Sequence, residues 1–160
     1  MPLEPPHRKL VKSIHEPGDF HELTFSVYGR RPHLATDDRR IILSRAIDAA
    51  LLNHPFRLVA FVYMLDHVHL LVLPIVPEPE LDALKSAIKR PSSVRIKRLL
   101  SSGHAKLLAE LTIQERPGKK AFRFWQEGGG YDRNLRTPQA VLASINYLHL
   151  NPVRKGLVER

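Results

Sequence analysis

The sequence contains no cysteine. Disulfide bonds, thiolate zinc sites and a cysteine nucleophile are therefore excluded, and the absence fits a reducing compartment. The chain also lacks an apolar run of about 18 residues, the length that a membrane-spanning helix requires. Its first residues, with Glu4, Pro5 and Pro6, form no apolar signal segment. These absences predict a soluble, cytoplasmic protein.

Acidic residues are fewer than basic ones. The chain has 16 Asp and Glu against 25 Lys and Arg, which gives a formal net charge of +9. Such an excess favours a polyanionic partner, most often nucleic acid, since each phosphate contact made by Lys or Arg releases a bound counterion. The excess is also concentrated, with seven Lys or Arg and no Asp or Glu in residues 85–106. Nucleic acid is therefore the first hypothesis for a partner, beside the alternative of a merely basic soluble protein.

The chain is long enough for one domain with its own core, since 160 residues with 43% hydrophobic content are typical of a globular protein. Residues 1–19 carry prolines and mixed charges without periodicity, which predicts a loosely held N-terminal arm. Residues 20–160 are expected to form the single domain, with a loop or insertion at 101–121.

Apolar periodicity predicts the elements of this domain. The first are a strand over residues 20–28, a helix over 36–52 and paired strands over 56–64 and 68–73. A helix over 80–89 is interrupted at Pro91 and resumes over 94–100. A last strand or extended segment follows over 122–126, and the final helix begins at Thr137 and ends at Asn151 and Pro152. This order predicts an α+β fold of ferredoxin-like type, with one antiparallel sheet and helices packed on one face.

Two histidines, His67 and His69, flank Val68 in the second strand of the predicted hairpin. Strand side chains alternate between faces, so both imidazoles point to the same side of the sheet. Two convergent imidazoles make half of a metal site or half of an active site. The alternative is that both rings are structural residues with satisfied hydrogen bonds.

Tyr147 lies off the apolar stripe of the last helix, with Ser144 at i−3 and Asn151 at i+4. A phenol is a weak nucleophile unless a base or a cation favours its ionised form. A divalent metal on the two histidines would polarise a phosphodiester oxygen and hold the scissile group in line with the phenol. Asn151 could complete the coordination through its amide oxygen. The alternatives are that Tyr147 only packs and that Asn151, before Pro152, only stops the helix.

Three motifs occur in a specific order: MLDHVHLL at residues 64–71, Phe124-Trp125-Gln126 with Tyr131-Asp132-Arg133, and NYLHLNPVRKGL at 146–157. Together they resemble the REP-associated tyrosine transposases, which are single-tyrosine HUH transposases of the IS200-like transposase family. The resemblance spans roughly residues 20–158. It implies the HUH endonuclease fold and a DNA-nicking enzyme.

The resemblance implies a Mg- or Mn-dependent single-stranded DNA endonuclease and strand transferase that acts at hairpins formed by REP-like palindromes. His67 and His69 would be the metal ligands and Tyr147 the nucleophile, which forms a covalent 5′-phosphotyrosine and leaves a free 3′-hydroxyl. Asn151 stands where the family places a polar residue one helical turn after the tyrosine. Asp66 replaces the usual Asn or Glu before the first histidine, and it could assist the metal or cap the turn.

The candidates for DNA-backbone contacts are basic residues in four parts of the chain. They are Arg30, Arg31, Lys85, Lys89, Arg90, Arg95, Lys97, Arg98, Arg123, Arg133 and Arg154. Phe124 and Trp125 are either core residues or a stacking platform for unpaired bases. Relatives in the family include monomers and homodimers, and both states stay open here. The alternative function is a domesticated protein that binds hairpin DNA or RNA without cutting it, and a third is a metal hydrolase without a covalent intermediate.

Overall fold

The structure is a computed structural model that describes residues 14–159. Its main feature is a four-stranded antiparallel sheet with the strand order β2-β3-β1-β6. Its strands are β1 (Phe20–Ser26), β2 (Phe56–Tyr63), β3 (His67–Pro74) and β6 (Tyr131–Leu135). The central strands β1 and β3 pair so that Thr24 lies opposite His69. The expected hairpin of β2 and β3 is confirmed.

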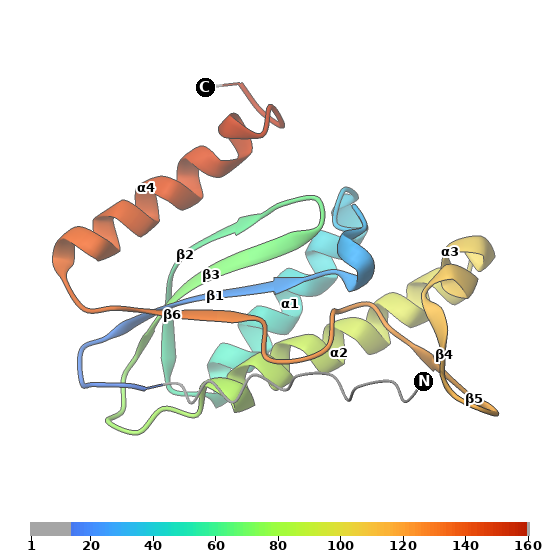
Figure 1. Cartoon of the computed structure of the whole chain (residues 1–160), viewed down its shortest axis with the longest axis horizontal. Helices are drawn as coiled ribbons and strands as arrows, with labels where there is room; N and C mark the ends of the chain where they lie inside the picture. Colours follow the sequence, from blue (N-terminus) through green and yellow to red (C-terminus); the bar gives the residue numbers. More distant parts are fainter. Residues whose placement is uncertain (1–13, 160) are drawn as a thin grey trace, which may run out of the picture.

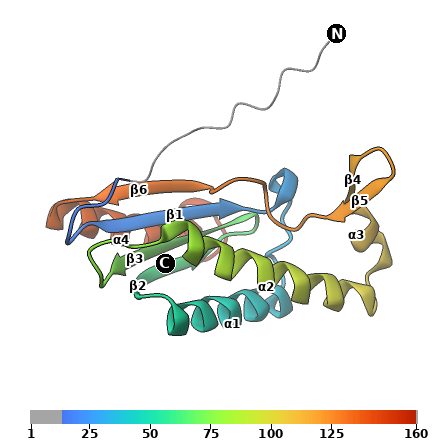
Figure 2. The ribbon, with the colours of Figure 1, turned by 90° about the horizontal axis from the view of Figure 1, so that it is seen from below.

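Two long helices cover one face of this sheet (Figure 1 and Figure 2). They are α1 (Asp37–Asn53) and α2 (Leu81–Ser101), which pack against each other. Leu23 and Phe25 of β1 and Leu70 of β3 point toward them and are fully or almost fully buried in the main core. The alternation of side chains along β1 and β3 therefore sends every second residue to the opposite face.

The opposite face is covered by the last helix, α4 (Pro138–Arg154), through a second apolar cluster of Leu71, Leu135 and Leu148. The expected α+β fold with an antiparallel sheet is confirmed. The expectation that helices pack on one face was too narrow, because α4 packs on the other. The cause lies in β3, whose apolar run continues on both faces and needs cover on both.

The helix α2 runs without interruption through Pro91, contrary to expectation. A proline inside a helix removes a single backbone hydrogen bond, and burial of the flanking turns can offset that loss. Here Ile88, Ser92 and Ile96 bury the same side of the helix, and the Ser92 hydroxyl donates to the Ile88 carbonyl at 2.7 Å.

The segment expected as a loop or insertion at 101–121 has regular structure. It forms a short helix, α3 (Ala105–Glu110), and a two-stranded hairpin of β4 (Thr112–Arg116) and β5 (Lys119–Phe122). This part extends beyond the end of the main sheet (Figure 1). Leu111, between α3 and β4, is buried in the main core and anchors it.

The fourth strand of the sheet is β6, and not the segment 122–126 that the sequence suggested. Phe122 ends β5, and the residues after it join the main sheet only through an isolated bridge from Trp125 to Val27. Phe124 and Trp125 are buried core residues, and the Trp125 indole donates to Ser92 Oγ at 3.0 Å. The sequence of β6, Tyr-Asp-Arg-Asn-Leu, is mostly polar, so its pairing with β1 could not be read from apolar alternation.

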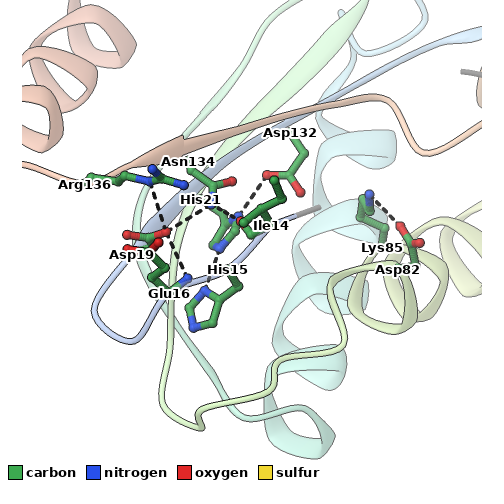
Figure 3. A network of polar contacts seen from close by, with 10 residues as sticks. All are labelled: Ile14, His15, Glu16, Asp19, His21, Asp82, Lys85, Asp132, Asn134 and Arg136. Atoms are coloured by element: carbon green, nitrogen blue, oxygen red, sulfur yellow. Dashed lines mark hydrogen bonds and ion pairs between the residues drawn. The ribbon is translucent and has the colours of Figure 1, made fainter. Parts of the chain in front are cut away.

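Residues 14–19 of the expected arm pack beside β1 and β6, while residues 1–13 lie outside the described part. Figure 3 shows the polar network that holds this segment. The fully buried His21 ring bonds to Asp132 through Nδ1 and to His15 through Nε2, both at 3.0 Å. Asp19 accepts from the Asn134 amide at 3.1 Å and lies 3.6 Å from Arg136 Nε.

Across residues 14–159, no helix has both the length and the apolarity needed to cross a membrane.

Gly130 decides where β6 can begin. Its φ is +70°, and a Cβ there would lie 2.2 Å from the backbone oxygen of Thr24. We expect Gly130→Ala to lower the free energy of unfolding by about 3 kcal/mol, because left-handed strain and a backbone clash add. Gly128→Ala is the matched control, since Gly128 has φ +89° and no atom within 4 Å of that position; it should cost about 1 kcal/mol. Urea unfolding of both variants measures this, and equal losses would contradict the close approach.

Candidate active site

His67 and His69 converge on one point, as their positions on β3 predict. Their Nε2 atoms lie 3.1 Å apart, and the rings stand edge to face. Asn151, from α4, brings its side-chain amide within 3.3 Å of His69 Nε2. The amide nitrogen and oxygen exchange places by a half-turn of the group, so either atom can occupy this position. Three side chains from two elements therefore meet at one point on the α4 face of the sheet.

The outer nitrogen of each ring has its own partner. Asp66 Oδ1 lies 2.6 Å from His67 Nδ1, and Thr24 Oγ1 lies 2.8 Å from His69 Nδ1. An ionised carboxylate can only accept, so His67 carries a proton on Nδ1 and a neutral ring then presents a lone pair at Nε2. Asp66 stands behind His67, where it orients the ring, and not among the converging atoms. Its other oxygen is 2.9 Å from Arg30 Nε.

His69 is held in its neutral form. It is 7% exposed, and burial, the nearby His67 and Arg30 lower its pKa to about 4, against the opposing effect of Glu22. A neutral imidazole has a lone pair to offer a metal without first losing a proton. At neutral pH the His69 ring could therefore offer this lone pair to a cation.

The convergent set fits a divalent metal. Among residues 14–159 no three His, Cys, Asp or Glu side chains form a metal cluster, and the third group that could serve as a donor beside the two imidazoles is the Asn151 amide. Ligands bound at about 2.1 Å to one ion lie roughly 3 Å apart, which matches the 3.1 and 3.3 Å separations. Facing Nε2 lone pairs at that distance repel each other unless a proton or a cation lies between them.

Tyr147 stands beside this set. Its side chain is 41% exposed, and its ring packs edge to face on His69 with centroids 5.8 Å apart. The guanidinium carbon of Arg154, two turns further along α4, lies 5.8 Å from the Tyr147 ring centroid. The phenol is therefore both close to the imidazoles and open to a large substrate.

The helix α4 continues through Pro152 to Arg154, whereas the sequence predicted that Asn151 and Pro152 end it. Pro152 lacks only the N–H that would bond the Leu148 carbonyl, and the next residues recover bonds at the C-terminus, including Lys155 N to Asn151 O at 3.1 Å. The continuation matters for the site. It keeps Asn151 helical and buried, with its amide on His69.

Glu22 is a site residue that sequence reasoning missed. Its carboxylate is 5% exposed on β1. Oε2 accepts from Ser144 Oγ at 2.8 Å and from Arg133 Nη2 at 3.0 Å, and Oε1 lies 3.6 Å from His69 Nδ1. In the sequence Glu22 looks like an ordinary solvent-facing residue of a half-buried strand. No local signal distinguishes it, because the residues that surround it, on β3, β6 and α4, are far away in the sequence.

An open cleft of about 470 Å³ lies beside the convergent set. Its lining comes from the sheet and from α4 and consists of Glu22, Thr24, His69, Tyr131, Arg133, Ala143 and Tyr147. The cleft combines two phenols, one guanidinium and one buried carboxylate. Such a lining can receive an anionic and partly aromatic ligand.

The basic residues predicted to contact DNA fall into separate groups. Arg133 lines the cleft, Arg154 lies over Tyr147, and Arg30 pairs with Asp66. These three are at the site. Arg31 lies 3.8 Å from Glu110, and Arg123 pairs with Glu115 and Glu127.

The predicted contacts on α2 are on the other side of the sheet from the cleft. Lys85 is buried and bonds Asp82 at 2.7 Å (Figure 3), and Lys89 donates to the carbonyls of Gln126 and Gly128 at 2.9 Å each. Burial and the neighbouring Lys85 lower the pKa of Lys89. Both ammonium groups thus have internal partners. The remaining α2 residues are exposed: Arg90, Arg95, Lys97 and Arg98.

No protein-family model and no curated protein matches the sequence. Among solved structures, a REP-associated tyrosine transposase bound to a REP hairpin is similar, with a TM-score of 0.70 and 17% sequence identity over 94% of this chain and 76% of that chain. A candidate transposase from Deinococcus radiodurans R1 also aligns, with a TM-score of 0.47 and 19% identity over 90% of this chain and 97% of that one. The first match establishes that this chain has the fold of the HUH transposases.

The lowered pKa of His69 predicts a pH-dependent stability in metal-free protein. Between about pH 6.5 and 4 the unfolded chain binds a proton at this residue and the folded chain does not, so stability falls as the pH decreases. The loss attributable to His69 should reach at most about 3 kcal/mol. Urea unfolding at pH 7 and pH 4.5 measures it, with His69→Asn as the comparison. We expect a smaller difference between the two pH values in the variant, and an unchanged difference would contradict a neutral buried His69.

Proposed function

We propose that this protein is a divalent-metal-dependent single-stranded DNA endonuclease and strand transferase of the REP-associated tyrosine transposase type. The observation that carries the proposal is the meeting of His67, His69 and Asn151 beside the Tyr147 ring. The HUH transposase fold supports it independently of those residues.

The metal would be held by His67 Nε2, His69 Nε2 and the Asn151 amide oxygen. A bound Mg or Mn ion polarises a phosphodiester oxygen and stabilises the charge that develops on phosphorus. Asp66 and Thr24 keep the two rings turned so that their Nε2 atoms face inward. The mixture of two imidazoles and an amide suits Mn better than Mg by ligand softness, although both are expected to work.

Tyr147 is the proposed nucleophile. Its phenol oxygen loses its proton and forms a bond to phosphorus, while the bond from phosphorus to the 3′-oxygen breaks and that oxygen takes up a proton. The products are a 5′-phosphotyrosine and a free 3′-hydroxyl. Attack by another 3′-hydroxyl reverses the step and joins two strands, because the covalent link conserves the phosphodiester. Arg154, above the ring, supplies positive charge close to the group that becomes anionic.

The substrate is proposed to be a single strand next to a hairpin. The similar solved structure is bound to a REP hairpin, and the net charge of +9 of this chain favours a polyanion. The exposed guanidinium groups at the site, of Arg30, Arg133 and Arg154, are the contacts that could reach a strand lying across Tyr147. The exposed cations of α2 could only hold DNA that passes around the sheet to its other face.

Tyr147→Phe should abolish covalent adduct formation, because it removes only the hydroxyl that attacks. The measurement is a denaturing gel of protein mixed with hairpin DNA that carries a single-stranded tail, in Mn or Mg and with a chelator as blank. Tyr131→Phe is the matched control, since it removes a second phenol in the same cleft and should leave the adduct intact. An adduct that survives Tyr147→Phe would overturn the assignment of the nucleophile.

His67→Ala should lose cleavage while it retains most of the affinity for DNA, because backbone contacts dominate binding. Gel-shift titration beside the adduct assay separates the two. Cleavage without any adduct in wild type would indicate a metal hydrolase. Tight binding of several hairpins with no cleavage in either metal would favour the domesticated binding protein instead.

A further inference from the structure

We propose that the cleft beside the convergent histidines is a nucleotide subsite in which Arg133 binds a DNA phosphate, the buried Glu22 positions Arg133, and the Tyr131 ring stacks on the adjoining base. This rests on the proposed function and deepens it, because it names how the strand next to the scissile phosphate is held. We refer to Glu22, Tyr131 and Arg133 as the cleft triad.

The three residues are brought together by strand pairing. Glu22 of β1 lies directly opposite Arg133 of β6, and Thr24 lies opposite Tyr131. Residues two apart in a strand share a face, so Tyr131 and Arg133 both point toward the α4 side. Thr24 also bonds His69 at 2.8 Å. The cleft triad is therefore linked to His69 by two side chains on β1, Thr24 and Glu22, whose Oε1 lies 3.6 Å from His69 Nδ1.

Glu22 fixes one end of the Arg133 guanidinium. Arg133 is about half exposed, and the ion pair with Glu22 Oε2 at 3.0 Å joins it to a side chain that is itself 6% exposed. Within residues 14–159 Glu22 is the one side chain that pairs with Arg133. A guanidinium has five N–H donors, so this contact leaves others for an oxyanion in the cleft. Guanidinium groups held this way bind phosphate in a defined orientation.

The burial of the Glu22 side chain is not accounted for by packing alone. An unpaired buried carboxylate is costly, and an apolar residue at this position would satisfy the fold. Instead Ser144 Oγ and Arg133 together saturate Oε2. The two contacts hold the exposed Arg133 in one orientation at the lining of the cleft. An arginine held in this way is suited to binding a ligand.

Tyr131 provides the aromatic component. It is 56% exposed, and its ring lines the cleft while packing on no other ring in the described part of the chain. Exposed aromatic rings next to cationic side chains stack on unpaired bases, and each such contact contributes about 1–3 kcal/mol. A phosphate on Arg133 and a base on Tyr131 are the two parts of one nucleotide.

The test is DNA binding measured by fluorescence anisotropy on a hairpin with a single-stranded tail, with a chelator present so that nothing is cleaved. Arg133→Gln should weaken binding about tenfold, the effect of losing one charged hydrogen bond. It should also reduce the slope of log affinity against log salt by about 0.7, the value for one single-strand phosphate contact. Arg136→Gln is the matched control, because Arg136 is a half-exposed arginine just past the end of β6 that pairs with Asp19 and does not line the cleft, so its substitution should change neither quantity.

Glu22→Gln separates positioning from simple charge. If Glu22 only repels DNA, its neutralisation strengthens binding. If it positions Arg133, binding weakens although negative charge is lost, and Arg133→Gln then adds little further effect in the double variant. Glu22→Asp, which keeps the charge but shortens the reach to Arg133, should weaken binding in the same way. Stronger binding in Glu22→Gln would overturn the positioning role.

Tyr131→Leu should weaken binding severalfold, and replacing that leucine by phenylalanine should restore most of the lost affinity, since stacking needs the ring and not the hydroxyl. A single free nucleotide should compete only weakly, whereas an unlabelled tail should compete fully, because the proposed ligand is part of a strand.

Unchanged affinity and salt slope in Arg133→Gln would overturn the subsite even if the Tyr147 adduct forms. Conversely, loss of binding in Arg133→Gln together with no adduct in wild type would retain the subsite and reject the proposed chemistry. If the wild-type protein binds no tailed hairpin, both proposals fail.

Discussion

Leu148 of α4 packs against Leu71 of β3 and Leu135 of β6, and this small apolar cluster holds the helix across the second face of the sheet. Burial of a leucine side chain contributes about 2 kcal/mol, so the cluster can hold α4 against the sheet. It is nevertheless small, and the positions of the site residues on α4 depend on it. Tyr147 and Asn151 flank Leu148 on the same helix. Their distances from His69 follow from where these three leucines meet.

Polar groups surround that cluster, and each is buried with a defined partner. Asn151 contacts His69, Ser144 donates to Glu22, and the neutral state of His69 avoids a buried charge beside the sheet. A carboxylate and two imidazoles in a confined space are costly unless cations or donors compensate them. Arg133 compensates Glu22, and the proposed divalent ion would compensate the facing Nε2 atoms. With the proposed ion bound, both the carboxylate and the imidazoles of the site would have a compensating partner.

Positive charge is divided between two roles. Lys89 holds the carbonyls of Gln126 and Gly128, which leads the chain into the close passage of Gly130 over β1 and so into β6. Arg133 follows Tyr131 by two residues on β6, so both side chains line the cleft and Arg133 is available to a ligand. Lys89 of α2 therefore fixes the path of the backbone, Lys85 pairs with Asp82 on its own helix, and the guanidinium group of Arg133 lines the cleft.

Local pattern in the sequence determined which residues share a face. The alternation through His67 and His69 places both imidazoles together, the stripe of the last helix marks Leu148 as buried, and the order of motifs indicates the HUH transposase fold. These properties depend on the period of a strand or a helix, which neighbouring residues alone define. The partners of those faces could not be read in the same way. The packing of α4 on the second face, the pairing of polar β6 with β1, the burial of Glu22 and the bonds of Lys89 to Gln126 and Gly128 arise from contacts between residues far apart in the chain. Only the tertiary structure decides which charged groups are buried and which remain exposed to solvent.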